Sequence, residues 1–177
     1  MKTIKTVLLV LTITAGLIMQ SCSSDDNSSI ETNCSNITDQ PVQGNFMGTD
    51  FISPQGYYQR GGFENDEILY YCEIYVREPI GGDCLFAVFD GPKDDIRFLL
   101  PSLEPQIVDL SSSIDNQVLA FNRIVNGTTE IEFANCATVE ITNYDSEAGE
   151  LQGKIYAEGE EGSIVDGNFT LDFCGID

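Results

Sequence analysis

Histidine and tryptophan are both absent from the 177 residues, and only 8 residues are lysine or arginine, against 29 aspartates and glutamates. Without histidine, the chain cannot form a Ser-His-Asp triad, a Cys-His pair, or a zinc or iron site with a histidine ligand. The formal net charge of −21 argues against nucleic-acid binding, because phosphate recognition depends on clustered lysine and arginine. With 42% hydrophobic and 21% charged residues, the composition and length fit one globular domain.

The apolar run near the start of the chain is too short to cross a membrane, which takes about 20 apolar residues. This run, residues 6–19, is 14 residues long and follows Lys2 and Lys5. A short positive segment before an apolar core of this length is typical of a secretory signal peptide. We therefore predict that residues 1–21 are a signal peptide.

The apolar core ends at Ser21-Cys22. A small residue followed by cysteine at this place resembles the lipobox of bacterial lipoproteins. The resemblance implies that cleavage leaves Cys22 as the new N-terminus, with a diacylglycerol on its thiol and usually an acyl chain on its amine. Several acyl chains anchor a protein far more firmly than one, because each buried CH₂ contributes about 0.8 kcal/mol. The alternative is a soluble secreted protein in which Cys22 is incidental.

Residues 23–27, Ser-Ser-Asp-Asp-Asn, resemble the surface-export tether of Bacteroidota lipoproteins. This resemblance implies an outer-membrane location facing the cell exterior, and the alternative is a plain hydrophilic linker. We expect residues 22–40 to be a flexible, acidic, serine-rich tether and residues 41–177 to form the domain. Loss of residues 1–21 leaves six basic residues against 29 acidic ones, so the formal charge becomes −23.

Five cysteines follow Cys22, and an exported chain meets oxidising conditions that favour disulfides. They are Cys34, Cys72, Cys84, Cys136 and Cys174. An odd number allows at most two bridges within the chain and leaves one thiol over. We predict a bridge between the neighbours Cys72 and Cys84, with either Cys136 or Cys34 as the partner of Cys174. A zinc site is disfavoured because the chain has no C-x-x-C spacing, and a catalytic thiol because it has no histidine.

From about residue 42 onward, apolar and polar residues alternate with the period of a β-strand. Residues 164–174 and 136–144 show the pattern of half-buried strands. Residues 68–76 and 85–89 carry apolar residues on both faces, which predicts central strands. The Asn126-Gly127 pair between two such runs predicts a tight hairpin, because both residues tolerate positive φ.

A helix over residues 105–119 is the main alternative to an all-β fold, but that segment is short and interrupted by three serines. We predict an all-β fold: a single antiparallel β-sandwich, or barrel-like sandwich, of about eight to ten strands.

Four segments carry a second resemblance: Gly44–Phe51, Val139–Asp145, Leu151–Ala157 and Val165–Cys174. Their order is similar to that in uncharacterised β-sandwich lipoproteins common in Bacteroidota. The resemblance implies the fold and the location, and it implies no activity and no catalytic residues.

Acidic side chains are the first candidates for chemistry. Asp145, Glu147 and Glu150 in a predicted turn are candidate Ca²⁺ ligands, since Ca²⁺ takes about six to eight oxygens. Asp94 and Asp95 form another acidic pair. The alternative in both places is a solvated acidic turn, because loops of an acidic exported protein gather carboxylates by chance. Two carboxylates could also hydrolyse glycosides, but the sequence places no pair at the required distance.

Tyrosines are the second candidates. The Tyr57-Tyr58 and Tyr70-Tyr71 pairs each place one ring on either face of a strand. Exposed tyrosines beside Asp and Asn could stack on sugars, so Tyr57, Tyr58 and Tyr71 are candidate ligand-binding residues. The alternative is that they are ordinary strand residues in the core and on the surface.

These features favour a non-catalytic, lipid-anchored lipoprotein of the outer membrane that acts as a binding or accessory module of the cell envelope. The alternative is a glycan-binding module, which in one version depends on Ca²⁺. We expect no catalytic residues and no cofactor. The expected partners are the membrane, through the lipid anchor, and an envelope protein or an extracellular glycan, with nucleic acid excluded.

Overall fold

The computed structural model describes Cys34 and residues 37–53, 55–64, 67–84, 86–111 and 118–175. The predicted signal peptide, Cys22 and most of the predicted tether lie outside these residues. The described residues form ten strands and no helix, and so include no helix capable of spanning a membrane. The strands are β1 (Gln43–Phe46), β2 (Thr49–Ile52), β3 (Gly56–Glu64), β4 (Glu67–Tyr75), β5 (Lys93–Leu100), β6 (Gln106–Asp109), β7 (Ala120–Val125), β8 (Thr128–Asp145), β9 (Glu150–Gly159) and β10 (Ile164–Phe173).

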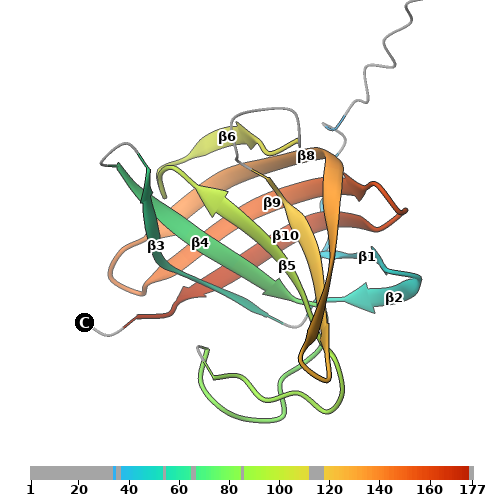
Figure 1. Cartoon of the computed structure of the whole chain (residues 1–177). Coiled ribbons are helices and arrows are strands. Elements are labelled where there is room, and N and C mark those ends of the chain that lie inside the picture. Colours follow the sequence, from blue (N-terminus) through green and yellow to red (C-terminus); the bar gives the residue numbers. More distant parts are fainter. Residues whose placement is uncertain are drawn as a thin grey trace, which may run out of the picture. The chain divides into compact units, whose positions relative to one another are not determined.

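The strands form one sheet that closes on itself. The order is β2-β1-β10-β3-β4-β5-β7-β8-β6, and β9 pairs with both β8 and β10. In Figure 1, β8, β9 and β10 lie behind β3, β4 and β5. All pairings are antiparallel except the short contact of β10 with β3, at Asp172–Phe173 and Tyr57–Tyr58. The predicted all-β, antiparallel, barrel-like sandwich is therefore confirmed.

The alternation in the sequence places the core inside this ring of strands. Every second residue of β9, from Leu151 to Gly159, is buried, and the residues between them are half-buried. Strand β10 buries Val165, Phe169 and Leu171 in the same way, which confirms the predicted strand over residues 164–174. Phe173 at the end of β10 is the exception, with 38% of its surface exposed.

Two hairpins turn through a pair of residues that both have positive φ. Asn126 and Gly127 between β7 and β8 both have positive φ, at 51° and 79°. Met47 and Gly48 between β1 and β2 do the same, at 44° and 83°. Two-residue turns of this type match the twist of antiparallel strands. The predicted Asn126-Gly127 hairpin is thus confirmed.

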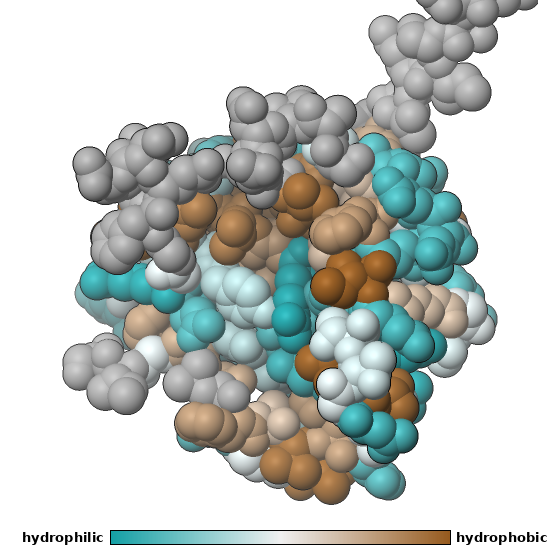
Figure 2. All heavy atoms as spheres, viewed as in Figure 1, coloured by the Kyte–Doolittle hydropathy of each residue, from teal (hydrophilic) through white to brown (hydrophobic). Residues whose placement is uncertain are grey.

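The prediction of a central strand at residues 85–89 is wrong. Strand β4 is central as predicted, but the described residues that follow it, 76–84 and 86–92, form a loop, called the β4–β5 loop below. Its side chains Ile80, Phe86 and Val88 are 69%, 75% and 52% exposed, and Figure 2 shows apolar side chains gathered over this loop at the bottom of the view. An apolar run of five residues has no period that separates a buried strand from a surface loop.

The chain attaches to β10 before the predicted domain boundary at Pro41. The Thr38 amide donates to Asp166 Oδ1 (2.8 Å), and Asn168 donates from its side chain to Asp39 Oδ1 (2.8 Å) and from its backbone to Gln40 O (2.6 Å). Residues 38–40, which were expected to belong to the tether, are therefore part of the folded domain.

Two disulfides join Cys34 to Cys136 and Cys84 to Cys174, each with a Cα–Cα distance of 5.9 Å. Cys72 is a buried free thiol, and burial raises its pKa. The expected two bridges and one spare thiol are confirmed, but both predicted pairings are wrong. Cys72 lies on the core face of β4 with Ile74, whereas Cys84 packs outside the sheet against Tyr57 and Tyr75. Successive residues of β4 face opposite sides of the sheet, and the thiol of Cys72 lies on the core side while that of Cys84 lies on the other side.

Candidate functional site

A hollow of about 320 Å³ lies at one end of the ring of strands, and we call it the end pocket. Its aromatic lining consists of Tyr58, Tyr70, Tyr144 and Phe173. Its polar lining consists of Arg60, Ser102, Glu104 and Ser146, and Leu103 and Gly149 complete it. Small-molecule sites typically have volumes of about 300–1,000 Å³, so the end pocket suits one small group or a terminal sugar.

Strand ends bring these residues together. Tyr58 and Arg60 are two positions apart on β3 and therefore face the same side of the sheet. Arg60 pairs with Tyr70 of β4, and Tyr144 and Phe173 lie at the ends of β8 and β10. The pocket thus combines the β3–β4 hairpin with β8 and β10, which come much later in the sequence.

The aromatic rings form a packed wall. Tyr58 is 1% exposed, and its ring lies 6.2 Å from that of Tyr144 in an edge arrangement and 5.5 Å from that of Phe173. Burial, and secondly a hydrogen bond with Tyr144, raises the pKa of the Tyr58 phenol. Tyr58 is therefore a fixed, uncharged ring in the buried part of the pocket wall. The ring of Phe173 is partly exposed.

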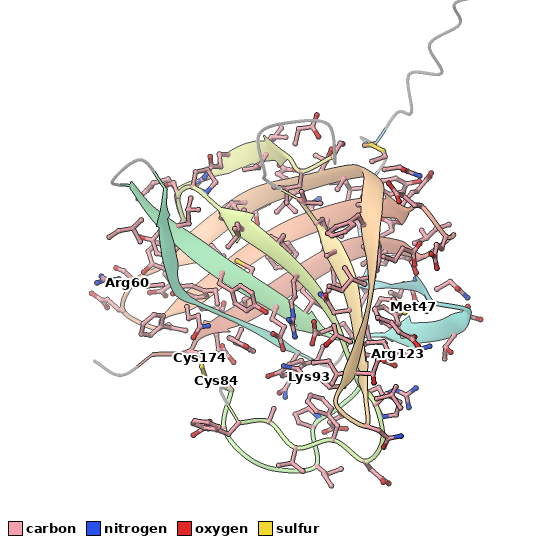
Figure 3. The ribbon with its side chains drawn as sticks, viewed as in Figure 1. Met47, Arg60, Cys84, Lys93, Arg123 and Cys174 are labelled. Atoms are coloured by element: carbon pink, nitrogen blue, oxygen red, sulfur yellow. A yellow bond between two sulfur atoms is a disulfide. The ribbon has the colours of Figure 1, made fainter. Side chains whose placement is uncertain are left out.

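Arg60 differs from the other basic residues after Cys22. Five of the six form ion pairs, which are Arg77 and Arg123 with Asp94, Lys93 and Arg97 with Glu73 and Asp95, and Lys154 with Asp39. Arg60 is exposed and forms no ion pair with any side chain that the structure describes. Figure 3 shows it at the end of the domain away from Lys93, Arg123 and Met47. The lining of the end pocket therefore contains one arginine that is not ion-paired to any described side chain, together with one carboxylate, that of Glu104.

On the outer face of the sheet, on the side of the β4–β5 loop, a second group of polar side chains comes together. Glu73, 1% exposed, accepts hydrogen bonds from the hydroxyls of Tyr57 (3.0 Å) and Tyr71 (2.9 Å) and pairs with Lys93 Nζ at 2.6 Å. Asp95 is fully buried, and Arg97 Nε lies 2.5 Å from its Oδ1. We call these six residues the buried network.

Tyr75, whose ring lies 5.7 Å from that of Tyr57, connects the buried network to the β4–β5 loop. The Tyr75 hydroxyl donates to the carbonyl of Cys84 (3.1 Å), and the rings of Tyr75 and Phe89 lie 5.2 Å apart. Tyr57 and Tyr71, two of the three predicted ligand-binding tyrosines, are used here as donors to Glu73, and burial raises the pKa of both phenols. Of the three, the structure places Tyr58 alone in the end pocket.

The pH dependence of stability should report on the buried network. Burial, and secondly the charge of Glu73, raises the pKa of Asp95 from 3.8 to about 6. With a raised folded-state pKa, the stability that Asp95 contributes is full below about pH 4 and is lost as the pH rises through about 6. Asp95→Asn removes the ionising group. We therefore expect the unfolding free energy of the variant, relative to that of the wild type, to rise between about pH 4.5 and pH 7.

Urea unfolding of both proteins at the two pH values measures this difference. The exposed Asp90 provides the control, since Asp90→Asn should change both values equally. A difference between Asp95→Asn and wild type that stays constant with pH would contradict the assignment.

In the predicted acidic turn of Asp145, Glu147 and Glu150, two of the carboxylates accept hydrogen bonds from within the turn or from the strand that follows it. Asp145 Oδ1 accepts from the amides of Glu147 (2.9 Å) and Ala148 (3.0 Å), and Glu150 accepts from Gln152 (2.5 Å). Over the described ranges, no three or more acidic or cysteine side chains converge as a metal site would require. The geometry thus has the form of the solvated acidic turn.

A larger hollow of about 650 Å³ lies beside β1, β2 and the start of β10. Its lining includes the acids Asp50 and Asp166 and one aromatic ring, Phe51, which is 8% exposed. It therefore lacks both the stacking surfaces and the positive charge of the end pocket.

Sequence reasoning missed Arg60, Tyr144 and Phe173. The alternation of β3 does place Arg60 on the face of Tyr58, and that signal was available. The approach of β8 and β10 to β3 required the closed topology, which no local pattern contains. Searches of protein-family models, of curated proteins and of solved structures found no match to this chain. Its function is therefore argued from its own geometry.

Proposed function

We propose that the chain is a non-catalytic, lipid-anchored binding module of the cell envelope, and that its ligand occupies the end pocket. The observation that carries the proposal is the convergence of four aromatic rings in a hollow of about 320 Å³ with one arginine that forms no ion pair with a described side chain. Apolar walls with a few placed polar groups are the general form of a small-ligand site.

The distribution of carboxylates supports a role without catalysis. Of the four buried acids that the structure describes, Glu73, Asp94 and Asp95 are paired with basic side chains. The fourth, Glu132, accepts hydrogen bonds from the amides of Glu161 and Ser163 and lies outside the end pocket. The end pocket has a single carboxylate in its lining, that of Glu104. Glycoside hydrolysis by the usual route needs two carboxylates about 5–9.5 Å apart, flanking one bond.

A glycan is the ligand class that the aromatic lining favours. Tyrosine and phenylalanine rings offer flat apolar faces to the C–H face of a sugar, and the hydroxyls of Ser102 and Ser146 can bond to sugar hydroxyls. Measuring binding in Ca²⁺ and again in EDTA separates a Ca²⁺-dependent site from a Ca²⁺-independent one.

The binding test uses variants of the pocket wall. Because the chain has no tryptophan, tyrosine fluorescence of the purified protein can report ligands from a panel of mono- and oligosaccharides. We expect Tyr144→Ala to weaken binding about tenfold or more, since it removes a stacking ring. Tyr156→Phe on β9, outside the pocket, is the control and should bind normally. Binding that survives Tyr144→Ala unchanged would contradict the proposal.

The lipid anchor has its own test. Cys22→Ser should move the protein from the membrane fraction to the soluble fraction, because no thiol remains to accept the diacylglycerol. A tagged copy on intact cells should bind antibody without permeabilisation if residues 23–27 direct export. Antibody binding seen after permeabilisation alone would instead indicate a periplasmic partner.

A further inference from the structure

We propose that Arg60 binds an anionic group of the ligand, a carboxylate or a sulfate ester on an acidic sugar. This inference rests on the proposed function, because it assigns the ligand class of the end pocket. It begins from the use of positive charge in the chain. After Cys22 the chain has six basic residues for 29 acids, and five of the six bind acids of the chain itself.

The position of Arg60 is the second argument. It follows the buried Tyr58 by two residues on β3 and faces Tyr70 across the β3–β4 pair. The regular register of these strands breaks immediately after it, between Arg60 and Phe63. Arg60 therefore lies in the lining of a hollow with aromatic walls, where a bound sugar would lie between the rings and the charge.

The chemistry of the guanidinium is the third argument. Its planar fork of donors matches the oxygens of a carboxylate or a sulfate, and such charge-assisted hydrogen bonds are about twice as strong as neutral ones. A neutral sugar offers the fork only uncharged hydroxyl acceptors, which form weaker hydrogen bonds. On a domain with a formal charge of −23, an anion is repelled by most of the surface, so a local cation selects the place where it binds.

The remaining polar groups of the pocket suit the rest of such a ligand. Glu104 is available as an acceptor for sugar hydroxyls, and its amide hydrogen-bonds to Ser102 Oγ (3.1 Å), which ties the two residues together. An acidic sugar would thus contact the rings with its face, Arg60 with its anionic group, and Glu104 with its hydroxyls.

The test compares three probes: glucuronate, glucose 6-sulfate and glucose. Calorimetry of the purified protein should show that at least one acidic probe binds about tenfold or more tightly than glucose, and that added NaCl weakens this preference. Preference for glucuronate identifies a carboxylate ligand, and preference for glucose 6-sulfate identifies a sulfate ester.

The variants are Arg60→Gln, Arg60→Lys and, as the matched control, Lys154→Gln on β9. Arg60→Gln should lower the affinity for the acidic probe about tenfold or more while leaving glucose unchanged, and Arg60→Lys should be intermediate because it keeps the charge without the fork. Since Arg60 is exposed, its variants should unfold at the same urea concentration as the wild type.

Equal binding of glucose and both acidic probes, or undiminished binding by Arg60→Gln, overturns the inference. So does the failure of all three probes to bind. The proposed function is judged separately, by whether Tyr144→Ala weakens any ligand found in the wider panel.

Discussion

Asp94→Ala should destabilise the domain by about 3 kcal/mol, one of the two largest effects expected here. Asp94 is fully buried, and two arginines from different segments bind its carboxylate. Arg123 donates through Nε to Oδ1 (2.9 Å) and through Nη2 to Oδ2 (3.2 Å), and Arg77 Nε lies 3.0 Å from Oδ2. Removing the carboxylate leaves two neighbouring guanidinium groups without their shared partner, and removing one partner is the costly way to break a buried ion pair.

Urea unfolding at neutral pH measures this loss. The exposed Asp90 in the β4–β5 loop provides the control, and Asp90→Ala should change stability by less than about 0.5 kcal/mol. Asp94→Asn keeps the shape of the side chain but removes its charge, so it should fall between the wild type and Asp94→Ala. A loss below about 1 kcal/mol for Asp94→Ala would show that the two arginines simply turn to water.

Removing the Cys84–Cys174 disulfide by a double change to alanine should cost about 4 kcal/mol. The two cysteines are 90 residues apart, so the bridge removes much of the freedom of the unfolded chain. The same change releases the β4–β5 loop from the end of β10. We therefore also expect faster amide hydrogen exchange in this loop, whose apolar side chains are already exposed.

Peptide mapping without reduction provides the control for this prediction. Wild type and Cys72→Ala should both yield the Cys34–Cys136 and Cys84–Cys174 peptides, because Cys72 faces the core. A Cys72–Cys84 peptide from the wild type would contradict the structure and restore the pairing predicted from sequence neighbours.

The amount of structure that the sequence predicts depends on how local each signal is. Alternation in β9 and β10 and the Asn126-Gly127 turn are local, and the structure confirms them. The disulfide partners cannot be predicted from local sequence, because each bridge joins cysteines that are far apart along the chain. Whether Cys72 and Cys84 can meet depends on which side of the sheet each of them reaches. The apolar run at residues 85–89 failed for a different reason, since hydrophobicity alone does not show whether a segment is buried.

The candidate site divides along the same line. The sequence offers Tyr58 as an exposed ring, because a tyrosine pair on a strand places one ring on either face, but in the structure this ring lines the end pocket with only 1% exposure. That rule does not state which of Tyr57 and Tyr58 faces inward, and Tyr57 instead donates to Glu73 outside the sheet. The alternation of β3 places Arg60 on the face of Tyr58, but its lack of an acidic partner among the described side chains is known only from the structure.

The two disulfides interleave along the chain, because Cys84 lies between Cys34 and Cys136, and Cys136 lies between Cys84 and Cys174. At least one bridge therefore spans every peptide bond from residue 34 to residue 174. A protease that nicks the domain once within this stretch cannot release either fragment, and the nick becomes visible on a gel after reduction. Separation of the domain from the residues that precede it by a single cleavage requires a cut on the N-terminal side of Cys34.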